Sequence, residues 1–288
     1  MFLTSMSLLT SNEERQARIA SSASSRGLLL TVLGEFVRPH GGAAWTQTII
    51  DAMAALDVSE KATRQVLARM DDEGSLHRSR DGRRTRWHLT DSMQQLLDDG
   101  AERIYRHGVD VPEWDGRWSV LLASVPDDER ADRHRLTVGL NWAGYGSLGQ
   151  GTWISPWVDR EADATRVIAE AGVSRPTSFV AQIGALGDGA ELVGRAWDLD
   201  ALAADYRAFA DATEAVAQLA TDGEGALVET VHTVHRWRRF PLLDPQLPVE
   251  LLPADWPSQR AAGAFAAVRC THGRRATNWW LDREARYG

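Results

Sequence analysis

The chain has 288 residues, a formal net charge of −8 and a single cysteine, Cys270. One cysteine excludes an intramolecular disulfide, and the length exceeds one typical domain, so the composition favours a multidomain protein of a reducing, cytoplasmic compartment. Residues 1–10 are mildly apolar but lack a basic segment and lead into charged residues, which argues against a signal peptide or a membrane span. We expect residues 1–24 to form a flexible arm.

Three helices are predicted in the first part of the chain. Residues 25–37 and residues 46–56 each place apolar side chains at helical spacing. Ser59 then begins a third helix as its N-cap, with the acid Glu60 in the first turn, and Gly74 ends it.

The third helix has two distinct faces. At about 100° per residue, its apolar side chains fall on one side, and they are Ala62, Val66, Leu67 and Met70. The other side holds Lys61, Arg64, Gln65, Ala68 and Asp72. A polar and basic outer face is what a recognition helix presents to a DNA major groove.

Positive charge is concentrated in the segment that follows this helix. Residues 76–90 contain five arginines and one acid, a formal charge of +4, so the rest of the chain sums to −12. A basic segment on an acidic chain is the electrostatic pattern of a nucleic-acid-binding surface.

The same segment is predicted to be a β-hairpin. The Asp81-Gly82 dipeptide favours a two-residue type I′ turn, which would pair Arg80 with Arg83. Like charges opposed across two strands cost about 0.2–1 kcal/mol, so this pairing suggests that an anion such as phosphate binds at the tip. Two apolar residues, Leu76 and Trp87, are expected to anchor the base.

Together the helices and the hairpin predict a winged helix-turn-helix over residues 25–90 that binds double-stranded DNA. The alternative is an ordinary solvated surface, which is where charged side chains are usually found. RNA is a weaker candidate, because no aromatic platform accompanies the basic residues.

The remaining sequence predicts a multidomain α+β protein. A connector helix is expected within residues 91–113, begun by Thr90 and interrupted near Gly100. Residues 114–190 follow the order β-α-β-β-α-β of a ferredoxin-like domain. Residues 191–288 are expected to form a helical C-terminal domain, with helices over residues 199–219, 226–240, 258–272 and 277–287.

Several short sequences carry a resemblance to a known family. They are residues 27–37, Gly41-Gly42, residues 62–70, Glu73-Gly74, Gly82-Arg83-Arg84, residues 87–90, the Trp-Asp-Gly-Arg-Trp sequence at 114–118, residues 151–156, 196–199, 235–239, Asp244-Pro245, Leu247-Pro248 and residues 250–257. In this order they cover nearly the whole chain, which thereby resembles the PaaX family of bacterial transcriptional repressors.

The resemblance implies a function. PaaX-type proteins repress aromatic catabolism, best known for phenylacetate, by binding operators as dimers until an aryl acyl-CoA releases them. We therefore expect a homodimeric, cytoplasmic repressor that is associated with the nucleoid when bound to its operator, with no enzymatic activity, no cofactor and no membrane partner. An activator is equally compatible with a winged helix.

The resemblance also assigns residues to DNA binding. Arg64 and Arg69 match the family's recognition-helix arginines, and Gly82, Arg83 and Arg84 match its wing. We expect base contacts from Lys61, Arg64 and Gln65. Phosphate or minor-groove contacts are expected from Arg78, Arg80, Arg83, Arg84 and Arg86.

An effector site is harder to predict. An acyl-CoA needs cations for its phosphates and an apolar slot for its aryl group. Residues of these types are Arg236, Trp237, Arg238, Arg239 and Trp256. The alternative is that Trp237 is a core residue and the arginines pair with acids such as Asp244 or Asp255, since aromatic residues at helical spacing usually serve packing.

Enzymatic alternatives rest on weaker patterns. His232 and His235 are three residues apart on a helix but have no third metal ligand at a typical spacing. Cys270 and His272 are two apart and would point in different directions on a helix. A metal-dependent nuclease on the ferredoxin-like domain would need an aspartate at the end of its first strand, where Asp127 and Asp128 are displaced into the following helix start.

Overall fold

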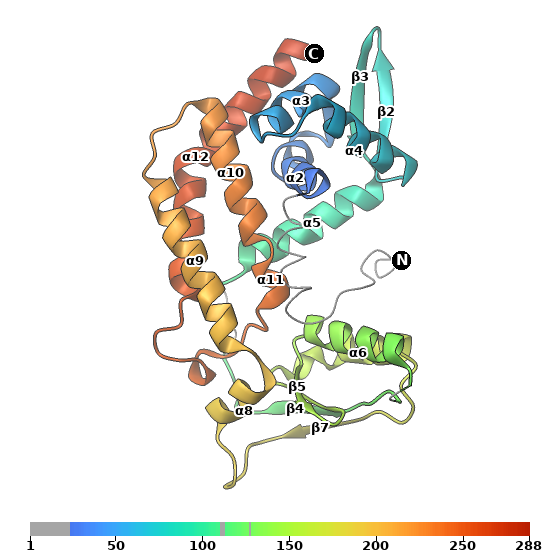
Figure 1. Ribbon diagram of the computed structural model, residues 1–288, viewed down its shortest axis with the longest axis vertical. Helices are drawn as coiled ribbons and strands as arrows, with labels where there is room; N and C mark the ends of the chain where they lie inside the picture. The colour runs from blue at the N-terminus through green and yellow to red at the C-terminus, as the bar shows by residue number, and fades with distance from the viewer. Residues whose placement is uncertain (1–23, 110–112, 127) are drawn as a thin grey trace. The chain divides into compact units, whose positions relative to one another are not determined.

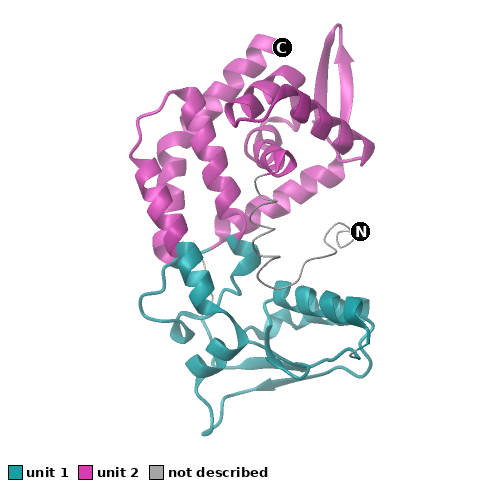
Figure 2. Cartoon of the chain, in the orientation of Figure 1, with its two compact units in different colours: residues 1–13, 108–206, 240–258 teal, residues 14–107, 207–239, 259–288 magenta. Residues whose placement is uncertain are grey.

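The computed structural model describes residues 24–109, 113–126 and 128–288. The predicted arm, residues 1–24, therefore lies outside the described residues except for Ser24. The chain divides into two compact units, each assembled from separate stretches of sequence (Figure 2). Among the described residues, unit 1 contains residues 108–109, 113–126, 128–206 and 240–258, and unit 2 contains residues 24–107, 207–239 and 259–288.

Unit 2 begins with the three predicted helices (Figure 1). The elements are α2 (Ser25–Val32), a π-helical turn (Leu33–Val37), a 3-10 turn (Arg38–His40), strand β1 (Ala43–Trp45), α3 (Thr46–Ala55) and α4 (Glu60–Asp72). The Ser59 hydroxyl accepts a hydrogen bond from the Ala62 amide at 3.3 Å, so the predicted N-cap of α4 is confirmed. The sequence does not predict β1, because three residues are too few for an alternating pattern to emerge.

Strands β2 (Leu76–Asp81) and β3 (Arg84–Leu89) form the predicted hairpin, and the sheet has the order β1-β3-β2. The predicted pairing of Arg80 with Arg83 is wrong. Arg80 lies opposite Thr85, and Asp81 lies opposite Arg84, which leaves Gly82 and Arg83 as the two turn residues. The argument that opposed arginines at the tip require an anion therefore fails.

The observed turn has three physical causes. Gly82 has a φ of +57°, and glycine at the first of the two turn positions is typical of a type II′ turn. This register also places Leu76 opposite Leu89, which are 2% and 9% exposed, so both apolar side chains enter the core together. In addition, an opposite-charge pair, Asp81 and Arg84, replaces the predicted like-charge pair.

The core of unit 2 joins the start of the sequence to its later helices. Helices α10 (Gly223–Trp237) and α12 (Ser258–Tyr287) contribute to the same hydrophobic cluster as α2, α3 and the hairpin. Phe36 stacks on Trp280 with ring centroids 5.4 Å apart. A hydrogen bond of 2.9 Å links the Thr31 hydroxyl to Nδ1 of His235. Residues 25–89 therefore complete their core only with residues from the last quarter of the sequence.

Helix α12 is one continuous helix of 30 residues. The predicted pair of helices, residues 258–272 and 277–287, is therefore wrong. Gly273 costs about 1 kcal/mol in a helix interior relative to alanine, but His272 and Ala276 beside it are both fully buried. Their packing outweighs the local preference of glycine to end a helix.

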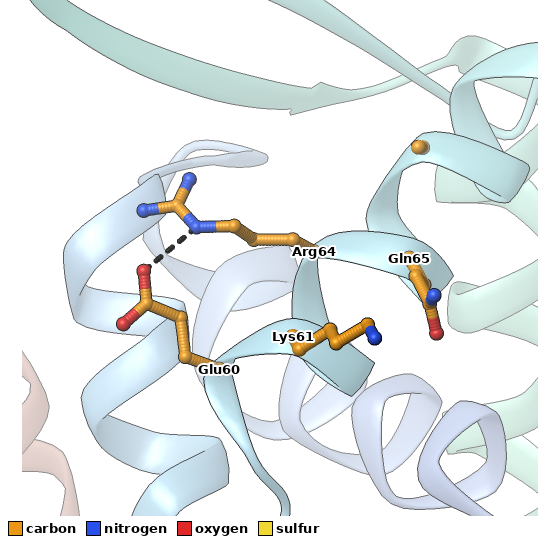
Figure 3. A pocket seen from close by; sticks show the side chains of 5 residues that line it. Glu60, Lys61, Arg64 and Gln65 are labelled. Carbon is orange, nitrogen blue, oxygen red and sulfur yellow. Dashed lines mark hydrogen bonds and ion pairs between the residues drawn. The ribbon is translucent and has the colours of Figure 1, made fainter.

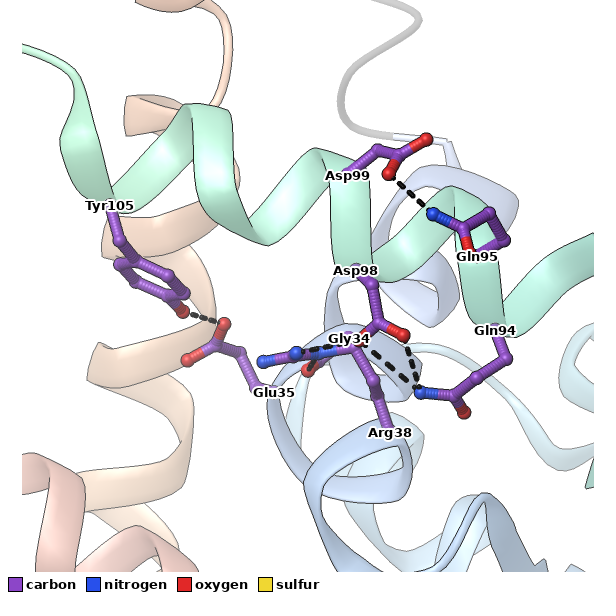
Figure 4. A network of polar contacts seen from close by, with 8 residues as sticks. All are labelled: Gly34, Glu35, Arg38, Gln94, Gln95, Asp98, Asp99 and Tyr105. Carbon is purple, nitrogen blue, oxygen red and sulfur yellow. Dashed lines mark hydrogen bonds and ion pairs between the residues drawn. The ribbon is translucent and has the colours of Figure 1, made fainter.

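Helix α5 (Asp91–Arg106) is attached by polar contacts to the π-helical turn and the 3-10 turn that follow α2 (Figure 4). The Arg38 guanidinium donates to Asp98 at 3.0 Å, and the Tyr105 hydroxyl donates to the Glu35 carboxylate. Burial raises the pKa of Glu35, and the hydrogen bond from Tyr105 and the charge of Arg269 oppose that shift. The predicted interruption at Gly100 is absent, because no packing or proline forces a break there.

Unit 1 contains a four-stranded antiparallel sheet. Its elements are β4 (Trp118–Leu122), α6 (Arg130–Trp142), β5 (Gly146–Gly149), β6 (Thr152–Ser155), α7 (Glu161–Glu170) and β7 (Thr177–Ala181). The strand order is β5-β6-β4-β7, with every neighbouring pair antiparallel. The predicted element order β-α-β-β-α-β is confirmed. Leu121 packs with residues of α6 and α7, and Trp118 packs with Val193 on the other side of the sheet.

The remaining elements are short or helical. They are a 3-10 turn (Val158–Arg160), α8 (Gly189–Ala196), α9 (Leu199–Ala217), α11 (Phe240–Leu243) and a 3-10 turn (Val249–Leu251). The amide of Ala201 donates to Asp198 at 3.0 Å, so the predicted cap of α9 is confirmed. Within the described residues, no helix combines the length and hydropathy that crossing a bilayer requires.

Candidate nucleic-acid interface

The outer face of α4 is exposed and polar. Lys61, Arg64, Gln65 and Ala68 are all exposed and, with Glu60, line a shallow hollow of about 590 Å³ (Figure 3). The inner face is anchored by the buried side chains of Thr63, Leu67 and Met70. Burial on one side thus fixes the helix and leaves the other side available. The division agrees with the predicted faces, with Ala62 and Val66 half-buried at the boundary.

One ion pair lies on this outer face. The Arg64 Nε donates to Glu60 Oε1 at 2.8 Å, and the two side chains are 54% and 58% exposed. An exposed pair of this kind contributes about 0.3–0.5 kcal/mol. The pair therefore orients the Arg64 guanidinium only weakly. A phosphate or a guanine edge could replace the Glu60 carboxylate at a small cost in free energy.

The predicted DNA-binding arginines of the hairpin have different surroundings. The side chains of Arg80 and Arg83 make no hydrogen bond or ion pair with any part of the chain that the structure describes. Arg78 lies 3.3 Å from Asp71 of α4. Arg84 and Arg86, by contrast, contact α12, as described below. Arg69 is exposed at the end of α4, near the edge of the outer face.

A pair of histidines on the hairpin was not predicted. His77 and His88 lie directly opposite each other, and their rings stack with centroids 4.8 Å apart. Burial lowers the pKa of His88, and the neighbouring charges of His77 and Arg86 lower it further. Residues that lie opposite each other in a hairpin have residue numbers with a constant sum. The pairing of His77 with His88 could therefore be found from the sequence only if the register of the hairpin were known.

The predicted effector residues are divided between the two units. Trp237 is 1% exposed, its indole N–H donates to the Ile104 carbonyl at 3.0 Å, and it stacks on Phe265. Its interpretation as a core residue is therefore confirmed. Trp256 belongs to unit 1, where it packs edge-on against Tyr206, whereas Trp237 belongs to unit 2.

Of the three arginines beside Trp237, Arg236 is exposed, and Arg238 and Arg239 are half-buried. The Arg236 guanidinium lies 5.3 Å from the centroid of the Phe209 ring. Burial lowers the pKa of both Arg236 and Arg238, and the charge of Arg239 adds to the shift at Arg236. An acyl-CoA site at residues 236–239 stays a prediction.

The residues considered for catalysis have structural surroundings. Burial lowers the pKa of His235 to about 4, and its ring is bonded to Thr31. His272 is buried and bonds the Val216 carbonyl at 3.0 Å, while Cys270 is exposed. Asp127 lies outside the described residues. Within the described residues, no three histidine, cysteine or acidic side chains form a group that could hold a metal ion.

Comparison with known proteins identifies the class to which this architecture belongs. Three family models match successive parts of the chain: PaaX-like protein at residues 24–93, the PaaX protein central Cas2-like domain at residues 111–193, and the PaaX-like protein C-terminal domain at residues 197–282. The transcriptional repressor PaaX of Escherichia coli (strain K12) is 31% identical over 253 residues, which cover 84% of this chain and 78% of the relative.

A solved structure is also similar. The uncharacterized protein Rv0674 from Mycobacterium tuberculosis matches with a TM-score of 0.60 and 26% identity, covering 91% of this chain and 99% of the other. The sequence matches place the chain in the class of transcriptional regulators. The chain belongs to the PaaX family.

Proposed function

We propose that residues 25–90 form a winged helix-turn-helix and that the chain is a sequence-specific DNA-binding regulator. The observation that carries the proposal is the combination of an exposed basic face on α4 with a hairpin tip whose Arg80 and Arg83 have no partner within the described residues. Both lie on a chain whose remaining charge is strongly negative. DNA would therefore be attracted to this segment and repelled elsewhere.

The outer face of α4 is proposed to read the bases. Lys61, Arg64 and Gln65 are exposed on the first two turns of the helix, the part of a recognition helix that reaches the floor of the major groove. Arg64 would exchange its pair with Glu60 for a base edge or a phosphate. Arg69, Arg78, Arg80 and Arg83 are proposed to contact the backbone and fix the register.

Family membership supports the broader assignment. We propose that the regulator acts as a homodimer on a pseudo-palindromic operator, represses an aromatic, phenylacetate-type catabolic operon, and is released by an aryl acyl-CoA. The proposed domains are the winged helix-turn-helix at residues 25–90, a connector at residues 91–113, a ferredoxin-like domain at residues 114–190 and a helical domain at residues 191–288. The strand order β5-β6-β4-β7 supports the ferredoxin-like assignment.

The test is selection of a binding site. The purified chain would be used to enrich duplexes from a random pool long enough for two half-sites about one helical turn apart. We expect enrichment of an inverted repeat, with binding that weakens as salt increases. Adding phenylacetyl-CoA should release the duplex, whereas phenylacetate and CoA alone should not.

Other outcomes would contradict the proposal. Failure to enrich any sequence would contradict the proposal of sequence-specific DNA binding. Cleavage of the pool that depends on Mg²⁺ or Mn²⁺ and disappears in Asp127→Ala would instead support a nuclease. Release by none of the compounds would leave DNA binding intact and remove the aryl acyl-CoA as effector.

A further inference from the structure

Helix α3 begins without a capping side chain of its own. Its N-cap residue is Trp45, which makes no side-chain capping hydrogen bond. A capping box would need a glutamate or glutamine three residues later, where this chain has Thr48. The missing acceptor comes from α12: Oε1 of Glu284 accepts a hydrogen bond from the Trp45 amide at 2.9 Å. The contact that a local glutamate normally makes is thus supplied from the far end of the sequence.

A second contact fixes the middle of the same helix. The Tyr287 hydroxyl donates to Oδ2 of Asp51 at 2.8 Å, and the Arg283 guanidinium lies 3.2 Å from the same oxygen. The Arg283 and Asp51 side chains are 21% and 23% exposed. Such sheltered polar contacts are more strictly positioned than exposed surface pairs. The C-terminal end of α12 lies beside α3 (Figure 1), and its side chains hold α3 at two points.

The same turn of α12 also holds the hairpin. The Arg84 guanidinium donates to the main-chain carbonyl of Tyr287 at 2.8 Å. The Arg86 guanidinium lies 3.9 Å from Oε2 of Glu284 and 5.2 Å from the centroid of the Trp45 ring. Two of the arginines expected to bind phosphate thus have protein partners, and both partners lie on the segment that holds α3.

We propose that residues 283–287, here called the α12 clasp, position the DNA-reading elements relative to one another. The inference rests on the proposed DNA-binding function. The clasp fixes the start of α3 and strand β3 to one rigid support, and α3 leads directly into α4. Glu284 and Tyr287 are positioning residues for DNA recognition, and Arg84 and Arg86 act through the clasp rather than by binding phosphates.

Positioning and phosphate contact differ in their salt dependence. Each phosphate contact that is lost reduces the slope of log affinity against log salt by about 0.9. A positioning residue changes the affinity but leaves the number of phosphate contacts, and hence the slope, as it was. Arg83→Ala should therefore flatten the slope, whereas Arg86→Ala should weaken binding at an unchanged slope.

The experiment compares clasp variants with a matched control on the same helix. Affinity for the duplex enriched from the random pool is measured over a salt series for Glu284→Ala, Tyr287→Phe and the control Asp282→Ala. Asp282 is exposed and lies two residues before Glu284, so Asp282→Ala repeats the loss of one negative charge on the same helix and leaves the contact between Glu284 and Trp45 in place. We expect the two clasp variants to bind about five- to tenfold more weakly, the order expected for the net loss of one hydrogen bond, with the wild-type slope.

Hydrogen exchange without DNA gives an independent measurement. The amides at the start of α3 should exchange faster in Glu284→Ala than in the wild type, and Asp282→Ala should leave them unchanged. Equal exchange and equal affinity in Glu284→Ala and Asp282→Ala would overturn the clasp. A slope that is smaller by about 0.9 in Arg86→Ala would show that Arg86 contacts a phosphate.

The design separates the two proposals. If the wild type enriches no duplex, the proposed function fails, but the exchange comparison still decides whether Glu284 holds α3. If Glu284→Ala proves too unstable to assay, Tyr287→Phe removes one hydroxyl and keeps the aromatic ring, so its affinity and exchange decide the question.

Discussion

Polar side chains have opposite surroundings in two regions of unit 2. On the outer face of α4 and at the hairpin tip, Lys61, Arg80 and Arg83 have no partner within the described residues. Where α2 and α3 meet α10 and α12, polar groups such as Thr31, His235 and Glu284 are buried or half-buried and hydrogen-bonded. The first region is free to meet a ligand, while the second holds the scaffold. Substitutions in the two regions should therefore separate binding from stability.

The largest expected effect is on DNA binding. Arg64→Ala combined with Arg83→Ala should weaken binding to the enriched duplex more than about 100-fold, because a base contact and a phosphate contact are lost together. The free energy of unfolding should stay within about 0.5 kcal/mol of the wild type, since both side chains are exposed. Fluorescence anisotropy and urea unfolding measure the two quantities.

A matched control for this variant is Arg103→Ala combined with Arg274→Ala. These exposed arginines lie on α5 and α12, and their loss changes the net charge equally. If both double variants weaken binding to the same extent, the effect belongs to the overall charge and not to the proposed face.

The largest effect on stability should come from the inner region. Phe36 is 2% exposed and stacks on Trp280, so Phe36→Ala should lower the free energy of unfolding by about 3–5 kcal/mol. Arg80→Ala, at the exposed tip, should change it by less than about 0.5 kcal/mol. Urea unfolding of both variants measures this difference in stability. Similar unfolding midpoints for the two variants would contradict the prediction.

The inner region should also make stability depend on pH. The pKa of His235 is lowered from 6.5 to about 4 by burial, so the unfolded chain binds the additional proton between these values. The free energy of unfolding should be highest above about pH 6.5 and should fall by about 2 kcal/mol when the pH is lowered to about 5. His235→Gln, which keeps a polar side chain beside Thr31, should lose this part of the pH dependence. An unchanged profile in that variant would assign the titration to other groups.

The smallest expected effect lies on the outer face. Glu60→Gln removes the acid that pairs with Arg64, so binding should strengthen about two- to threefold, as expected for releasing an exposed pair. Stability should fall by a few tenths of a kcal/mol, because an acid in the first turn of a helix interacts favourably with its dipole. Weaker binding would mean that Glu60 orients Arg64 for contact and does not compete with DNA.

Much of the local structure follows from local sequence. The cap at Ser59, the two faces of α4 and the element order of unit 1 are set by side-chain spacing within one element, and they are observed. The hairpin itself was predictable, but its register was not. Both Asp81-Gly82 and Gly82-Arg83 can form tight turns, and the choice depends on burying Leu76 against Leu89.

The errors share a cause. The continuity of α12 at Gly273 depends on burial of its neighbours, and the surroundings of Arg84 and Arg86 depend on a helix about 200 residues away in sequence. A short stretch of sequence contains no information about such long-range contacts. The sequence therefore identified which residue types could bind DNA but could not distinguish the arginines at the tip from those held by α12.

The discontinuity of unit 2 has a consequence for biosynthesis. Residues 24–107 are made first, yet the aromatic partner of Phe36 and the acceptor for the Trp45 amide are made among the last. Long-range contacts of this kind are slow to form, and apolar surface stays exposed until they do. A nascent or prematurely terminated chain that lacks α12 should therefore neither fold its first helices stably nor occupy DNA. Regulation would then begin only with complete molecules.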